Sequence, residues 1–160
     1  MKSQRILVVD DEKSIREFLT ILLQQEDYEV VTAASVAEGK ERLLKDRPNL
    51  VMCDLKLPDG SGLEVLQHAR DQNLATPFII ITAHTTPQHA LESMRAGAAE
   101  YLSKPFNVED LKTILTKLLS RPSEDPRPFE VTEFIGSSAP IRRILDMIPQ
   151  IASTPSTVLI

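Results

Sequence analysis

Short apolar runs alternate with amphipathic stretches along the first 120 residues. Three of the runs are apolar throughout, which is typical of parallel strands that helices cover on both faces. The stretches between the runs carry apolar residues at the i, i+3, i+4, i+7 spacing of a helix with one buried face. The pattern predicts strands over residues 6–9, 29–33, 50–53, 78–81 and 100–102. It predicts helices over residues 15–23, 36–45, 63–71, 87–96 and 108–119. Ser35 is the expected N-cap of the second helix and Pro87 the first residue of the fourth, and Pro58-Asp59-Gly60 is an expected turn.

These five β-then-α units predict an α/β domain over residues 1–120. Because crossovers between parallel strands are right-handed, such units form a doubly wound, five-stranded parallel sheet with helices on both faces. A fold of this kind places its functional site at the carboxyl ends of the strands. The polar residues that directly follow each strand are therefore the candidates for chemistry.

The residues after position 120 have a different pattern. Residues 121–133 contain three prolines and several charges, and they are predicted to form a linker. The prolines oppose continuation of the last helix as a coiled coil, so a dimer should use the domain surface instead. Residues 134–160 carry apolar positions at helical spacing and end in an apolar run that predicts the start of a strand. We expect this sequence to stop inside a second domain.

Composition and charge narrow the function classes. The chain has 18 Lys and Arg against 23 Asp and Glu, a net charge of −5, with no basic stripe for a phosphate backbone. Its single cysteine, Cys53, excludes an internal disulfide and a cysteine zinc site. No apolar run approaches the about 20 residues of a membrane span, and the first run is too short for a signal peptide. These features predict a cytoplasmic protein that binds neither membrane nor DNA by itself.

Polar side chains follow four of the predicted strands. Asp10 and Asp11 follow the first strand, Asp54 the third and Thr82 the fourth, and Lys104 closes the fifth. Taken singly, each has an ordinary explanation as a helix cap, a turn residue, a strand end or a surface charge. Their coincidence at one edge of the sheet favours a shared site.

The residue types at this edge indicate phosphoryl chemistry. Converging carboxylates repel one another unless a cation lies among them. Oxygen ligands without His or Cys favour Mg²⁺, which keeps coordination positions open for phosphate. A carboxylate beside Mg²⁺ can attack a phosphoryl group and form an acyl phosphate, while an ammonium and a hydroxyl stabilise the transferring oxygens. Asp54 is the predicted nucleophile, because it follows the most buried strand and has no acidic neighbour.

Further motif residues accompany these side chains. Pro58 and Gly62 follow Asp54, while Ala83 and Pro105 directly follow Thr82 and Lys104. Over residues 5–120 the sequence resembles the receiver domain of two-component response regulators, which has a flavodoxin-like (CheY-like) fold. The resemblance implies that Asp54 accepts a phosphoryl group from a phosphohistidine of a sensor histidine kinase. It also implies Mg²⁺ ligation by Asp11 directly, by Asp10 through water, by Asp54 and by the backbone carbonyl of Lys56.

The resemblance assigns roles to residues around Asp54 as well. Thr82 and Lys104 would bind the new phosphoryl group, and Tyr101 would be a switch whose ring turns inward when Thr82 moves. Lys56 and His84 would tune the lifetime of the acyl phosphate. A cis Lys104–Pro105 bond is expected, which proline permits at low cost. The switch would repack the surface of the fourth helix, fifth strand and fifth helix, and a homodimer is expected through that surface.

The last segment resembles a different family. Ile135-Gly136-Ser137, the apolar positions from Ile141 to Ile151 and the run Val158-Leu159-Ile160 resemble the opening of the AAA+ ATPase domain in NtrC-type, sigma-54-dependent activators. Under this interpretation residues 134–160 are the truncated start of that domain. The sequence contains no phosphate-binding loop, so no ATP hydrolysis is expected. Contacts with sigma-54 RNA polymerase and DNA would come only from regions outside this sequence.

Two alternatives to a phosphorylated switch make different demands on the same residues. An aspartate-nucleophile phosphatase would carry a second Asp two residues after the nucleophile, but Glu12 follows Asp10 and Lys56 follows Asp54 at that spacing. The chain is therefore expected not to be an enzyme, beyond assisting its own phosphorylation and dephosphorylation. A receiver-like interaction module without phosphorylation would need none of the strand-end residues, so the complete set counts against it.

Overall fold

The computed structural model of the chain describes residues 3–120. Its strands in the main sheet are β1 (Arg5–Val9), β2 (Glu29–Ala33), β3 (Leu50–Cys53), β6 (Phe78–Thr82) and β7 (Glu100–Ser103). All neighbouring pairs are parallel, in the order β2-β1-β3-β6-β7. The predicted doubly wound sheet is therefore confirmed. The predicted linker at 121–133 and the segment 134–160 lie outside the described residues.

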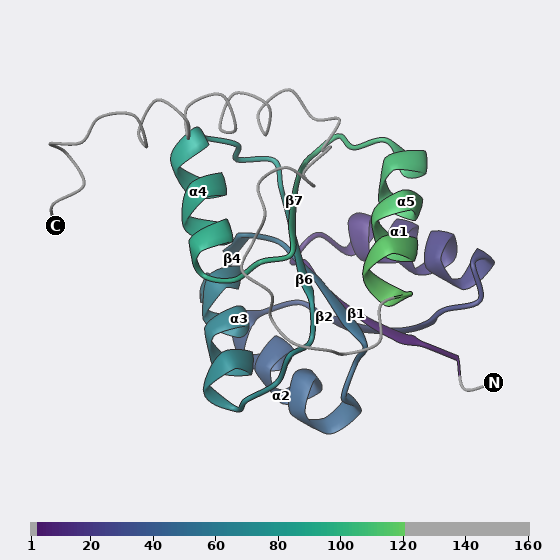
Figure 1. Cartoon of the computed structure of the whole chain (residues 1–160), viewed down its shortest axis with the longest axis horizontal. Coiled ribbons are helices and arrows are strands. Elements are labelled where there is room, and N and C mark those ends of the chain that lie inside the picture. Colours follow the sequence, from purple (N-terminus) through teal and green to yellow (C-terminus); the bar gives the residue numbers. More distant parts are fainter. Residues whose placement is uncertain (1–2, 121–160) are drawn as a thin grey trace, which may run out of the picture.

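Helices cover both faces of this sheet, as the fully apolar strands predicted. Figure 1 shows α1 and α5 on one side of the sheet and α2, α3 and α4 on the other. The helices are α1 (Lys13–Gln25), α2 (Val36–Asp46), α3 (Gly62–Asp71), α4 (Pro87–Arg95) and α5 (Val108–Leu119). Each face has its own apolar core. The core under α1 and α5 includes Ile6, Val8, Leu19, Leu23, Ile79 and Leu111, and the core under α2–α4 includes Leu7, Leu43, Val65, Phe78, Ile80 and Tyr101.

The helices begin at capping residues. As predicted, Ser35 caps α2, and its hydroxyl accepts a hydrogen bond from the Glu38 amide at 3.1 Å. Thr86 caps α4, and Pro87 occupies its first position, where the absent N–H costs nothing. Ser61 caps α3 in a capping box with Glu64. These caps define where the loops that leave the carboxyl edge of the sheet end and the helices begin.

A small hairpin follows β3, where the sequence predicted only the turn Pro58-Asp59-Gly60. Its strands are β4 (Lys56–Leu57) and β5 (Gly60–Ser61), which pair antiparallel. Gly60 has a φ of 154°, in a region that only glycine adopts readily. A Cβ on Gly62 would lie 2.1 Å from the Asp54 carbonyl oxygen, so glycine is also required where α3 begins. The hairpin and α3 are thus packed directly against the end of β3.

In the described part of the chain, no helix combines the length and the apolar character that crossing a membrane requires.

Candidate functional site

The predicted site residues meet at the carboxyl edge of the sheet. Asp10 follows β1 and Asp54 follows the adjacent β3, at the place where the strand order reverses. Thr82 ends β6, and Lys104 directly follows β7. Asp10 is 3% exposed, Asp54 7% and Thr82 0%. The sheet therefore brings these four side chains to one edge, with two carboxylates largely removed from water.

Lys104 links the carboxylates of this edge. Its Nζ lies 2.7 Å from Asp10 Oδ2, 3.0 Å from Asp54 Oδ2 and 3.5 Å from Glu12 Oε1. The Lys104 side chain is only 10% exposed, which excludes the alternative of a solvated surface charge. Its backbone amide donates to the Thr82 carbonyl at 2.9 Å, and the Lys104–Pro105 peptide is cis as predicted.

Burial and charge act in opposite directions on the pKa values of this cluster. Burial raises the pKa of the Asp10 carboxyl, although hydrogen bonds from Lys104 and the Glu12 amide partly offset that effect. Burial opposes the charged form of Lys104, but hydrogen bonds to Asp10 and Asp54 outweigh it and raise the pKa of the ammonium. Lys104 therefore stays cationic beside the carboxylates.

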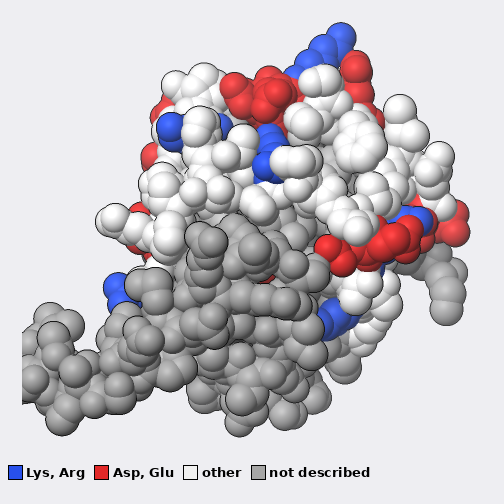
Figure 2. Space-filling view, turned by 90° about the horizontal axis from the view of Figure 1, so that it is seen from above, with Lys and Arg blue, Asp and Glu red and all other residues white. Residues whose placement is uncertain are grey.

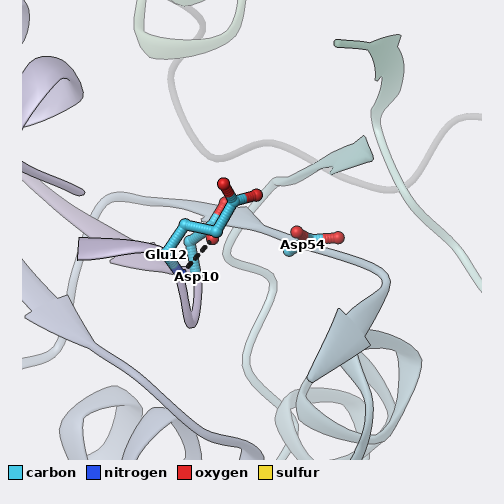
Figure 3. A group of neighbouring side chains, drawn as sticks. All are labelled: Asp10, Glu12 and Asp54. Atoms are coloured by element: carbon cyan, nitrogen blue, oxygen red, sulfur yellow. Dashed lines mark hydrogen bonds between the residues drawn. The ribbon is translucent and has the colours of Figure 1, made fainter. Parts of the chain in front are cut away.

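Three carboxylates lie close enough to share a cation. Oxygens of Asp10, Glu12 and Asp54 all lie within 4.8 Å of one another. Figure 3 shows Asp10 and Glu12 on the loop after β1, with Asp54 beside them at the end of β3. This all-oxygen set, without His or Cys, suits a hard divalent cation such as Mg²⁺. Asp11, predicted as a direct ligand, is exposed and lies outside this trio.

Backbone contacts hold the acidic residues in place. The Asp54 amide donates to the Val9 carbonyl at 2.8 Å, which ties the end of β3 to the end of β1. Asp54 Oδ1 accepts from the Lys56 amide at 3.2 Å, and Asp10 Oδ1 accepts from the Glu12 amide at 2.9 Å. These contacts between a carboxylate and the amide two residues on fix the side-chain directions without using the remaining oxygens.

The residues predicted to respond to phosphorylation lie beside this cluster. Thr82 is buried, and its hydroxyl accepts from the His84 amide at 3.2 Å. Tyr101 is 1% exposed, so its ring occupies an inward position in the core under α4. Burial and then the charge of Asp54 raise the pKa of Tyr101. The predicted tuning residues Lys56 and His84 are both exposed.

Sequence reasoning missed three contributors to this edge. The sequence pattern suggests Glu12 only as a helix cap, but its side chain makes no cap hydrogen bond and its carboxylate joins the acidic trio. Arg16 donates to the Asp10 carbonyl from α1. Asp59 accepts hydrogen bonds from α2, across a separation of 23 residues. The position of Glu12 two residues after Asp10 was a usable indication, whereas nothing local in the sequence indicated the other two contacts.

Charges on the surface are mixed rather than segregated. On the face that Figure 2 shows, Lys and Arg side chains of the described residues lie scattered among acidic and uncharged ones.

Known proteins are similar to this chain in sequence and fold. Residues 6–116 match the family of response regulator receiver domains. Response regulator protein PilR of Pseudomonas aeruginosa is 32% identical over 162 residues, covering 100% of this chain and 36% of PilR. Transcriptional regulatory protein ZraR of Klebsiella oxytoca is 32% identical over 160 residues, covering 97% of this chain and 36% of ZraR. The chain thus spans little more than a third of these curated relatives.

Solved structures agree with the sequence matches. A CheY-like response regulator receiver domain protein from Methanospirillum hungatei superposes with a TM-score of 0.71 at 34% identity, covering 74% of this chain and 95% of that one. The chemotaxis protein CheY4 of Vibrio cholerae gives 0.69 at 34% identity, covering 74% of this chain and 100% of that one. With the family match over most of its length, this chain belongs to the response regulator receiver domain family.

Proposed function

We propose that this receiver accepts a phosphoryl group on Asp54 from a phosphohistidine of a sensor histidine kinase. The observation that carries the proposal is the position of Lys104, whose ammonium lies within hydrogen-bond distance of both Asp10 and Asp54 at the edge of the sheet. A cation fixed there can neutralise charge on a phosphoryl group that joins Asp54. Family membership supports the same assignment.

The transfer exchanges one covalent bond for another. An oxygen of Asp54 forms a bond to phosphorus as the phosphorus–nitrogen bond of the phosphohistidine breaks, and the imidazole leaves with the electron pair and takes up a proton. Lys104 and the Thr82 hydroxyl bind the phosphoryl oxygens of the product. The protein contributes position and charge, which are the main terms in phosphoryl transfer.

The acidic trio is the proposed Mg²⁺ site. Asp10, Glu12 and Asp54 supply oxygens within reach of one another, and the Lys56 carbonyl is the expected backbone ligand. Asp11 remains the ligand that the family resemblance implies, although its side chain is exposed here. Mg²⁺ bound there would supply positive charge to the transferring oxygens.

The proposed output is a rearranged surface formed by α4, β7 and α5. Tyr101 lies on β7 and Thr82 ends the adjacent β6, so movement of Thr82 towards a phosphoryl group is transmitted to this surface. A homodimer through this surface, in a cytoplasmic regulator, is the expected consequence. The names of PilR and ZraR describe regulators, and their length beyond this chain leaves room for output domains. We infer an NtrC-type activator that contacts sigma-54 RNA polymerase and DNA through such regions.

In this proposal the chain is a phosphoacceptor rather than an enzyme with an external substrate. It assists formation and hydrolysis of its own acyl phosphate. An interaction module that is never phosphorylated would instead remain unmodified and unchanged in size under phosphorylating conditions.

Intact mass spectrometry after incubation with Mg²⁺ and acetyl phosphate tests the proposal. One phosphoryl adduct is expected on the wild-type chain, absent when Mg²⁺ is chelated and absent from Asp54→Ala. Asp59→Ala is unsuitable as a control because it lies in the adjoining turn, so Asp71→Ala on the far end of α3 serves instead. An unmodified wild-type mass, together with an unchanged hydrodynamic size in beryllofluoride, would establish the unphosphorylated module.

A further inference from the structure

Asp59, in the turn between β4 and β5, accepts hydrogen bonds from the start of α2. Its Oδ1 accepts from the Val36 amide at 2.7 Å and its Oδ2 from the Ala37 amide at 3.0 Å. Amides in the first turn of a helix have no partner within the helix, so they favour a carboxylate. The amides of Val36 and Ala37 hold the pKa of Asp59 below its usual range. The ionised carboxylate therefore makes this contact at neutral pH.

The start of α2 already has a cap close to it in the sequence. Ser35 accepts from the Glu38 amide, and the Glu38 carboxylate accepts from the Ala34 amide at 2.8 Å. Asp59 adds a contact that spans 23 residues and reaches a different helix from the one its own loop enters. A long-range contact of this kind restricts the loop as well as the helix.

That loop begins at the proposed phosphoacceptor. It leaves Asp54, pairs Lys56 with Ser61 in the hairpin, and returns where the Gly62 amide donates to the Leu55 carbonyl at 2.9 Å. At its far end Ser61 caps α3. The hairpin is therefore fixed to α3 at its base, while Asp59 fixes its tip to α2. Lys56, the residue expected to offer its carbonyl to Mg²⁺, lies between these two attachments.

We propose that Asp59 is a positioning residue for the phosphoacceptor site, holding the β4–β5 turn on the start of α2 so that the Lys56 carbonyl faces the acidic trio. The inference rests on the proposed function, because it concerns how the Mg²⁺ site of that function is held. Asp59 itself touches neither the metal nor the phosphoryl group. Its effect passes through Leu57 and Pro58, the two residues that connect Lys56 to Asp59.

The chain offers a matched pair of variants that separates loop positioning from helix capping. Asp59→Ala removes both hydrogen bonds to α2, and Ser35→Ala removes a hydrogen bond at the start of the same helix without touching the hairpin. Both variants should lower stability. Asp59→Asn keeps one side-chain acceptor but loses the charge. Its loop exchange rate and its Mg²⁺ affinity should therefore lie between those of wild type and those of Asp59→Ala.

Two readouts on the full chain test the inference. In hydrogen–deuterium exchange without Mg²⁺, the peptide covering residues 55–61 should exchange faster in Asp59→Ala than in wild type, but at the wild-type rate in Ser35→Ala. In a calorimetric Mg²⁺ titration, Asp59→Ala should raise the dissociation constant by about ten-fold, the lower end of the cost of losing a residue that supports metal ligands. Ser35→Ala should leave it unchanged.

Equal effects of the two alanine variants on exchange and on Mg²⁺ affinity would overturn the inference and leave Asp59 a helix cap. A faster-exchanging loop in Asp59→Ala with unchanged Mg²⁺ affinity would overturn it as well. Failure of the proposed function is distinguishable, because the wild-type chain itself would then show neither Mg²⁺ binding nor an adduct on Asp54.

Discussion

At the scale of single residues, the site balances two buried acids and one exposed acid against one ammonium. When all are ionised, the three carboxylates of Asp10, Glu12 and Asp54 and the ammonium of Lys104 have a formal charge of −2. Burial makes the negative surplus costly, as the raised pKa of Asp10 indicates. The same surplus favours a divalent cation, because two positive charges would cancel it. The charge state of the site therefore agrees with the proposed Mg²⁺ requirement.

Glu100 is a partly buried acid that lies away from the site, at the start of β7. Burial raises its pKa to about 7, while hydrogen bonding from the Tyr101 amide and the charge of Lys117 act in the opposite direction. Between pH 4.5 and 7 the folded protein therefore binds more protons than the unfolded chain does. It follows that Glu100 lowers the free energy of unfolding as the pH rises through this window.

Glu100→Gln should remove this pH-dependent loss of stability. Its side-chain oxygen can still accept a hydrogen bond from the Tyr101 amide. Above pH 7 we expect the variant to be more stable than wild type by on the order of 2 kcal/mol, since a pKa unit is worth about 1.4 kcal/mol and partial exposure reduces the effect. Below pH 4.5 the two proteins should be equally stable. Urea denaturation from pH 4 to 8 measures the difference, and Glu41→Gln, on the exposed side of α2, should show none. A constant difference across the pH range would contradict this account.

At the scale of elements, the start of α3 is packed against the end of β3 with no room for a side chain. A Cβ on Gly62 would lie 2.1 Å from the Asp54 carbonyl oxygen and 2.8 Å from Cys53 Sγ. Because the first of these atoms belongs to the backbone, Gly62→Ala must displace α3 or the phosphoacceptor strand. We expect a loss of about 1–3 kcal/mol in the free energy of unfolding, measured by urea denaturation.

Gly39→Ala, inside α2, is the matched comparison. Its methyl group would meet methyl groups of Val9 and Val65 at 3.3 Å, and side chains can adjust more readily than backbone. Alanine is also favoured over glycine inside a helix by about 1 kcal/mol, which offsets the tight contact. Gly39→Ala should therefore cost less than Gly62→Ala. The reverse order would show that the carbonyl contact at Gly62 is easily relieved.

Elements were predictable where the information is local. The apolar runs gave β1, β3 and β6 to within a residue, and Ser35 and Pro87 indicated helix starts because capping depends on near neighbours. Contacts that a loop makes with a distant helix were not predictable from pattern. Asp59 reaches α2 only because the hairpin turns towards it, and no spacing in the sequence encodes that contact.

Some features of the site were predictable from the sequence and others were not. Parallel strands end at one edge of a sheet, so the strand pattern alone is enough to predict that Asp10, Asp54, Thr82 and Lys104 meet. Which of two adjacent acids joins Asp10 depends on the turn between β1 and α1. In this turn the Glu12 amide donates to Asp10 and the Glu12 carboxylate joins the trio, whereas Asp11 lies outside it.

At the scale of the whole molecule, residues 3–120 contain the five-stranded sheet, its two apolar cores and every predicted site residue. We therefore expect residues 1–120 to fold and to bind a phosphoryl group by themselves. The prolines at 122, 126 and 128 also oppose a helix that continues from α5 into a dimer-forming coiled coil. The dimer surface is therefore expected within the receiver, on α4, β7 and α5.

Shortening the chain to residues 1–120 tests this expectation directly. With Mg²⁺ and beryllofluoride, a mimic of the acyl phosphate, we expect both the full chain and residues 1–120 to become dimers, while Asp54→Ala of either length stays monomeric. Light scattering coupled to size-exclusion chromatography measures the mass, and circular dichroism establishes that the shorter chain is folded. If only the full chain forms a dimer, the interface includes residues beyond 120, and the receiver surface is insufficient. If both dimerise, the interface lies within residues 1–120, as the receiver surface requires.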